Sequence, residues 1–135
     1  MGFYEKAQEQ QEFAELGCNA GKYSSSVYMS ILSIENYLKS TMHLVDKNEE
    51  FVRSHNVVGM YKLLVTKYKP SVEVEEILAI CRENINDSRY DDNVVYDKEF
   101  AYKFLENVKI VKAYIDNECS ATFNDLKNKF NKPAK

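Results

Sequence analysis

The apolar residues between positions 23 and 42 fall on one side of a helix, and this spacing constrains the fold more than any other feature. They recur at intervals of three and four, the period of an α-helix, at Tyr23, Val27, Ile31, Ile34, Leu38 and Met42. Tyr28 and Leu32 widen the stripe, as expected for the central helix of a bundle. Because the 135 residues include only four Gly and two Pro, we expect long helices joined by short connections.

The central helix is expected over residues 22–45. The same periodicity predicts the helices around it. The first runs from Phe3 to about Asn19, the third follows a cap at Ser54 or Asn56, and the fourth follows Ser71 and ends near Ile85. Asp97 caps the fifth, which reaches Ile115, and a weaker pattern at Phe123, Leu126 and Phe130 allows a sixth after Ser120. Residues 86–96 have no period and predict a loop. We expect an all-α, antiparallel up-and-down bundle of five to six helices, as a single domain over residues 1–130 with a frayed tail at 131–135.

Composition narrows the classes of function. A formal net charge of -3 gives no overall attraction to phosphates, so DNA binding is not expected and any contact with RNA needs a local basic cluster. No apolar run is long enough to span a bilayer, and the N-terminus lacks the pattern of a signal peptide. We therefore expect no membrane association and a cytoplasmic location.

The motifs of metal and nucleotide enzymes are absent from the sequence. There is no Gly-rich phosphate loop, no His-Glu-x-x-His and no Gly-x-Ser-x-Gly. The three cysteines are widely spaced and the two histidines have no partner at metal-ligand spacing. We expect no metal site, no cofactor and no catalytic residue of these classes.

One polar patch is a candidate binding site. Arg82, Asn86 and Arg89 are spaced by four and three, so they share one face of a helix. Guanidinium groups match phosphate geometry, and Tyr90 could stack on a base. A structural alternative uses the same residues, because Arg89 with Asp91 or Asp92 could hold the loop to neighbouring helices, with Tyr90 as a half-buried prop.

Two other sets of polar residues have open interpretations. Glu35 and Lys39 form an i, i+4 pair, either on the surface or lining a groove, and His55 is expected to cap or pack the start of the third helix. The ten tyrosines exceed the needs of the core, which favours self-association as a homodimer. We expect that six tyrosines cannot all point inward: Tyr61, Tyr68, Tyr90, Tyr96, Tyr102 and Tyr114.

Five segments, in this order, resemble the HEPN family of helical domains. They are the helix from Ala7 onward, Ser33–Lys39 with its Glu-x-x-Leu-Lys pattern, Ser54–Leu64 with a His-polar-apolar opening, Arg89-Tyr90-Asp91-Asp92, close to the family's Arg-Tyr-Pro-Asp, and the helix of Lys98–Ile115. Asp91 stands where proline is usual. The resemblance implies a helical bundle tied to nucleotide or RNA biology.

The chain departs from the ribonucleases of that family. Those members carry an Arg, four to six residues and then a His, paired across a homodimer. Arg53, Arg82 and Arg89 have no histidine at that spacing. Loss of such a general acid/base typically costs a factor of about 10² to 10⁴ in rate.

The resemblance therefore implies a non-catalytic binding or partner module, acting with a nucleotidyltransferase or in a toxin–antitoxin or phage-defence setting. Arg82, Asn86, Arg89 and Tyr90 would contact the ligand or partner, with Lys39 as a phosphate counter-charge. The alternatives are a divergent metal-independent ribonuclease that uses Arg89, Tyr90 or Asp91, and a module that binds only protein.

Overall fold

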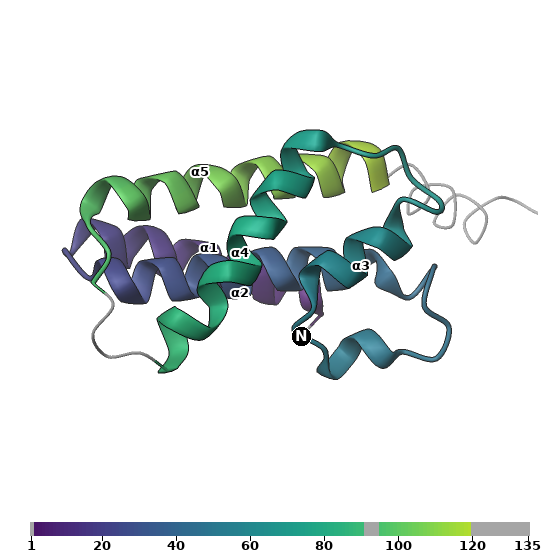
Figure 1. Cartoon of the computed structure of the whole chain (residues 1–135), viewed down its shortest axis with the longest axis horizontal. Coiled ribbons are helices and arrows are strands. Elements are labelled where there is room, and N and C mark those ends of the chain that lie inside the picture. The colour runs from purple at the N-terminus through teal and green to yellow at the C-terminus, as the bar shows by residue number, and fades with distance from the viewer. Residues whose placement is uncertain (1, 91–94, 120–135) are drawn as a thin grey trace, which may run out of the picture.

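The structure is a computed structural model that describes residues 2–90 and 95–119, and residues 85–90 by their backbone alone. Within this part the chain is all-helical, which confirms the predicted class. Figure 1 labels the α-helices in chain order. The described part contains five α-helices and two short helical turns. They are α1 (Phe3–Asn19), α2 (Tyr23–Met42), the 3₁₀ turn η1 (Glu50–Arg53), α3 (Val57–Leu64), α4 (Val72–Tyr90), α5 (Lys98–Tyr114) and the π-helical turn η2 (Ile115–Cys119).

Helix α2 is the centre of the bundle, as its wide apolar stripe predicts. It packs against α1 on one side and α5 on another, and α4 crosses it obliquely (Figure 1). Its stripe residues Val27, Ile31, Ile34 and Leu38 are fully buried. They join one core cluster with side chains from every described helix, including Phe104 of α5 and Leu78 of α4.

Small side chains bring α1 and α2 close together. The Ser26 hydroxyl donates to the Ala14 carbonyl and the Ser33 hydroxyl to the Ala7 carbonyl, each at 2.7 Å. A serine hydroxyl is short, so these bonds require the two backbones to approach closely. Gly21 makes the reversal between the helices, because its φ of 77° lies in the left-handed region that glycine adopts without strain.

Local capping chemistry sets the starts of α3, α4 and α5. The Asn56 side chain accepts from Gly59 N, the Ser71 hydroxyl from Val74 N and the Asp97 carboxylate from Phe100 N. The sequence predicts either Ser54 or Asn56 as the N-cap of α3, and in the structure the cap is Asn56. The predicted caps Ser71 and Asp97 are confirmed.

Several boundaries and exposures differ from the sequence predictions. The loop expected from residue 86 is wrong, because α4 stays helical to Tyr90; helix α2 ends at Met42 rather than near 45. Phe13 and Leu16 of α1 are 53% and 58% exposed, although the apolar residues of an amphipathic helix are expected to face the core. The predicted helix with Phe123, Leu126 and Phe130, the tail 131–135, and Asp91 and Asp92 lie outside the described residues.

Four of the six tyrosines named above point inward, and Tyr102 does not, which agrees with the expectation that they are not all buried. Tyr61, Tyr68, Tyr96 and Tyr114 are buried, Tyr102 is exposed, and the Tyr90 side chain lies outside the described part. Two of the buried hydroxyls bind backbone: Tyr61 exchanges hydrogen bonds with Ser71, and Tyr114 donates to the Lys69 carbonyl at 2.8 Å. These two tyrosines therefore hold the connection between α3 and α4 in place. The number of tyrosines in the sequence does not distinguish this structural role from a role in a protein interface.

Candidate functional site

Glu35 is the centre of a buried acid–base cluster. One carboxylate oxygen of Glu35 lies 2.8 Å from His55 Nδ1, and the other lies 3.3 Å from Lys39 Nζ. Lys39 also donates to the Val52 carbonyl at 3.0 Å. The Glu35 and Lys39 side chains are 4% and 5% exposed, so the interpretation as a surface pair is wrong. A carboxylate is stable at this depth because both of its oxygens have charged or polar partners.

His55 connects this buried cluster to solvent. Its side chain is 56% exposed although Nδ1 contacts the buried Glu35. A carboxylate only accepts hydrogen bonds, so the imidazole carries its proton on Nδ1 when neutral, and Nε2 is then the acceptor. His55 does not cap α3, since Asn56 does so, and its partner lies across the bundle on α2. No local sequence pattern predicts this contact, because the two residues are twenty positions apart.

Lys39, predicted as a phosphate counter-charge, lies inside the bundle rather than on its surface. Its ammonium is 5.7 Å from the centroid of the Phe3 ring and is held by Glu35 and Val52. It also borders a cavity of about 460 Å³ that Phe51 and His43 line. This cavity gives a ligand one route to Lys39.

The polar patch of Arg82, Asn86, Arg89 and Tyr90 lies on one continuous helix. Because α4 is helical to Tyr90, positions 82, 86 and 89 fall on the same face of its backbone. The Arg82 side chain is exposed. The side chains of the other three lie outside the described part, so the choice between a ligand site and a structural clamp stays a prediction.

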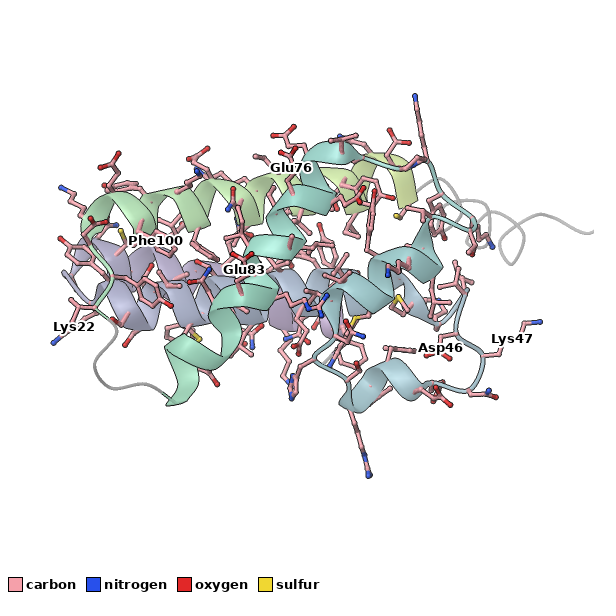
Figure 2. All side chains as sticks on the ribbon, in the orientation of Figure 1. Lys22, Asp46, Lys47, Glu76, Glu83 and Phe100 are labelled. Atoms are coloured by element: carbon pink, nitrogen blue, oxygen red, sulfur yellow. The ribbon has the colours of Figure 1, made fainter. Side chains whose placement is uncertain are left out.

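Acidic residues occupy the rest of α4. Glu73, Glu75 and Glu76 lie near its start, where the helix dipole favours negative charge. Glu83, which directly follows Arg82 in the sequence, lies further along the same helix, and Figure 2 labels it together with Glu76. Both arginines of α4 lie in its C-terminal half, where Glu83 and Asp87 balance them in formal charge. Helices α3 and α4 both pack on α2. The Glu35–His55–Lys39 cluster and the polar patch of α4 therefore lie on helices that share α2 as a neighbour.

Asn84, which the sequence analysis did not single out, supports the end of this helix. Its side-chain amide donates to the Ile80 carbonyl at 2.8 Å, and its side-chain oxygen accepts from the Tyr96 hydroxyl at 3.3 Å. The chain that enters α5 is thereby tied back to α4 close to Arg82. In the sequence Asn84 simply follows Arg82 and Glu83, and nothing in this order of residues predicts a contact with Tyr96.

The described residues contain neither a candidate metal centre nor a membrane-spanning helix. No group of three or more His, Cys, Asp or Glu side chains there is arranged to hold a metal ion. Within the same residues, no helix combines the length and the apolar character that crossing a membrane requires.

The fold and the site together define an all-helical bundle in which the buried Glu35 contacts the imidazole of His55 and the second half of α4 carries two arginines. The HEPN domain model matches residues 2–118, and the chain belongs to the HEPN family. Membership makes it a nucleotide- or RNA-associated module in the general sense. The crystal structure of TT1696 from Thermus thermophilus has the same fold, with a TM-score of 0.72 at 16% identity over 84% of this chain and 93% of that one. No curated protein matches the sequence.

Proposed function

We propose that this chain is a non-catalytic HEPN module that binds nucleotide or RNA phosphate through the C-terminal half of α4. Arg82, Asn86, Arg89 and Tyr90 contact the ligand, and Lys39 serves as a counter-charge through its neighbouring cavity. The module works in the cytoplasm as a homodimer, with a nucleotidyltransferase partner or in a toxin–antitoxin or phage-defence setting.

The continuity of α4 carries this proposal. A loop from residue 86 would have separated the two arginines, whereas a helix to Tyr90 keeps positions 82, 86 and 89 within two turns on one face. Two guanidinium forks at this spacing suit a phosphodiester backbone, which has its charges at regular intervals. The absence of an Arg-x4–6-His motif argues against the reaction of the family's ribonucleases.

The exposed apolar residues of α1 support the homodimer. Phe13 and Leu16 are one helical turn apart and more than half exposed. Large apolar side chains grouped in this way are typical of protein interfaces. Light scattering on the wild type and on Phe13→Ser/Leu16→Ser tests this part: the wild type should have twice the monomer mass and the variant the monomer mass.

The ligand is tested by thermal shift with ATP, GTP and a short single-stranded RNA. A ligand at 100 times its dissociation constant adds about 2.7 kcal/mol to the free energy of unfolding. Arg82→Ala/Arg89→Ala should abolish the shift, whereas Lys103→Ala/Lys109→Ala, which removes two exposed charges from α5, should keep it. A folded double arginine variant that keeps the full shift would contradict the assigned site.

A divergent ribonuclease is the second candidate, and the Glu35–His55 contact favours it. With Nδ1 held by Glu35, Nε2 could take the proton of a ribose 2′-hydroxyl while the 2′-oxygen attacks phosphorus. The 5′-oxygen leaves with a proton from solvent, which yields a 2′,3′-cyclic phosphate. Cleavage of RNA by the wild type, and its loss in His55→Ala, would support this candidate; RNA binding without cleavage by the wild type would exclude it.

A further inference from the structure

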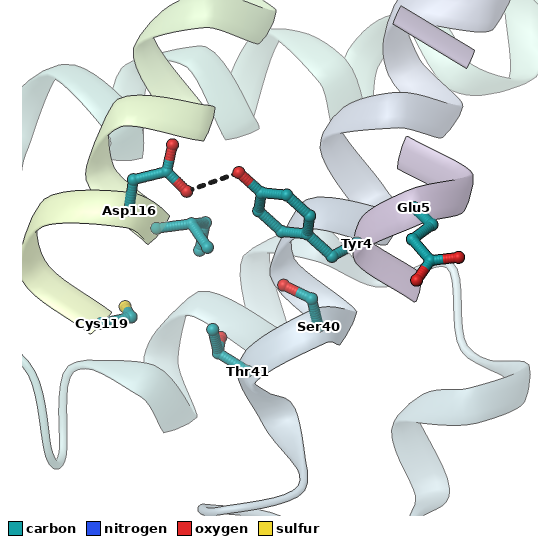
Figure 3. Close-up of a pocket in the computed structure, with 7 residues that line it drawn as sticks. Tyr4, Glu5, Ser40, Thr41, Asp116 and Cys119 are labelled. Carbon is teal, nitrogen blue, oxygen red and sulfur yellow. Dashed lines mark hydrogen bonds between the residues drawn. The ribbon is translucent and has the colours of Figure 1, made fainter. Parts of the chain in front are cut away.

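An apolar cavity opens beside the last described residue of the chain. It has a volume of about 380 Å³ and is lined by Tyr4 of α1, Thr41 of α2, and Ile115 and Cys119 of η2. Figure 3 shows these side chains converging from three elements, with Glu5 pointing away from the group. A cavity of about 150 Å³ accommodates one benzene ring, so this one has room for about two aromatic side chains.

The sequence that follows Cys119 has the complementary pattern. Phe123, Leu126 and Phe130 are spaced by three and four, which predicts one apolar helix face, while the residues between them are mostly Asn and Lys. Such a face needs a partner surface to be stable in water. The HEPN match ends at residue 118, so this segment is an addition of this chain to the part that matches the family.

Reach and charge favour the segment itself as the occupant of the cavity. Because Cys119 is part of the cavity wall, Phe123 begins at most about 14 Å away along an extended chain. Residues 120–135 contain four lysines and one aspartate, a formal charge of +3. The rest of the chain then keeps 14 of the 18 basic and 20 of the 21 acidic residues, a formal charge of -6, and Glu5 and Asp116 lie at the cavity.

We propose that residues 120–135 form a sixth helix that docks on its own protomer, with Phe123, Leu126 and Phe130 covering the cavity between α1, α2 and η2. The docked helix covers the apolar opening and places its lysines near Glu5. This inference does not depend on the nucleotide or RNA site of α4.

Thiol labelling of the full chain tests the docking. Burial raises the pKa of Cys119 to about 12, so this thiol reacts slowly while it is covered. Phe123→Ser/Leu126→Ser/Phe130→Ser should raise the alkylation rate of Cys119 by about tenfold or more, since even one buried aromatic ring is worth that factor. The buried Cys18 and Cys81, resolved by peptide mass, report whether the whole protein has loosened.

A matched variant and the solution mass complete the test. Asn124→Ser/Asn128→Ser/Asn131→Ser changes the same number of residues in the same segment and should label like the wild type. Equal Cys119 rates in the wild type and the apolar-to-serine variant would overturn the proposal. So would a variant that becomes monomeric from a dimeric wild type as Cys119 opens, because the segment would then dock on a second copy.

Discussion

Two lysine–carboxylate pairs share one sequence spacing but have different environments. Glu35 and Lys39 on α2 are almost fully buried, and Glu35 also binds His55. Lys112 of α5 and Asp116 of η2 are about one third exposed, and Asp116 also accepts from the Tyr4 hydroxyl at 2.8 Å. Both are i, i+4 pairs, in opposite order along the chain, and the sequence alone does not show that one is buried and the other partly exposed.

The difference shows that water, rather than spacing, determines the energy of such a pair. In the partly exposed pair, solvent screens the attraction and would rehydrate either charge if its partner were removed. In the buried pair the loss of one partner leaves a charge without water, and that penalty exceeds the attraction itself. The α2 cluster should therefore be the sensitive region of the molecule and the η2 cluster the tolerant one.

The largest effect is expected from Glu35→Ala. The substitution leaves the buried Lys39 ammonium with the Val52 carbonyl and the Phe3 ring but no counter-charge, and it frees His55, so we expect a loss of about 3–5 kcal/mol in the free energy of unfolding. Urea denaturation measures it. The double variant Glu35→Leu/Lys39→Met removes both charges and should recover most of the loss. A single-variant loss below about 1 kcal/mol would mean that the cluster is hydrated.

Alkaline pH should weaken the region around Tyr4 and Tyr37. Burial raises the pKa of Tyr37 to about 12, and burial with the Asp116 bond raises the pKa of Tyr4. In the unfolded chain tyrosine ionises near a pKa of about 10, so above that pH the folded protein retains protons that the unfolded chain has lost. The corresponding stability is complete below about pH 10 and is lost as the pH rises toward 12.

Tyr37→Phe isolates this contribution. The variant loses the hydrogen bond to Gln11, which costs about 1 kcal/mol at neutral pH, but it no longer has the Tyr37 proton to lose. Between about pH 9 and pH 11.5 the wild type should lose on the order of 2 kcal/mol more than the variant. Denaturant unfolding across that range measures both, and equal losses would contradict the assignment to Tyr37.

The smallest effects are expected at the partly exposed and exposed pairs. Lys112→Ala removes the ammonium that lies 2.7 Å from Asp116 and should cost about 0.5–1 kcal/mol. Lys109→Ala breaks a pair with Glu106 whose side chains are more than half exposed, and should cost less than about 0.5 kcal/mol. Thermal unfolding of both variants and the wild type, in low and in high salt, measures the two losses of stability and ranks them. A Lys112 effect as large as that of Glu35 would refute the comparison.

The sequence predicts best what depends on near neighbours. The caps of Ser71 and Asp97 and the stripe of α2 involve residues within a few positions, so their chemistry can be read directly from the order of residues. The burial of Glu35 and the inward Tyr114 depend on segments twenty or more positions away. No local pattern distinguishes these residues from surface ones.

The prediction for the end of α4 was wrong for a different physical reason. Asn86, Asp87 and Ser88 have low helix propensity and interrupt the apolar period, so a loop was the better local interpretation. The helix continues to Tyr90 in spite of them, and Asn84 ties the start of α5 to it through Tyr96. Tertiary contacts override a weak local preference of this kind. The candidate site consequently has a more regular geometry than the sequence suggested.

The salt dependence of RNA binding is the most direct test of the phosphate site on α4. Titration of a short single-stranded RNA at several salt concentrations gives a slope of log K against log salt of about -0.7 for each phosphate that the protein neutralises. Arg82→Ala/Arg89→Ala should weaken binding and reduce this slope by about 1.4 if both guanidinium groups contact phosphate. A wild type that binds no RNA or nucleotide, or a folded double variant with an unchanged slope, would contradict the account.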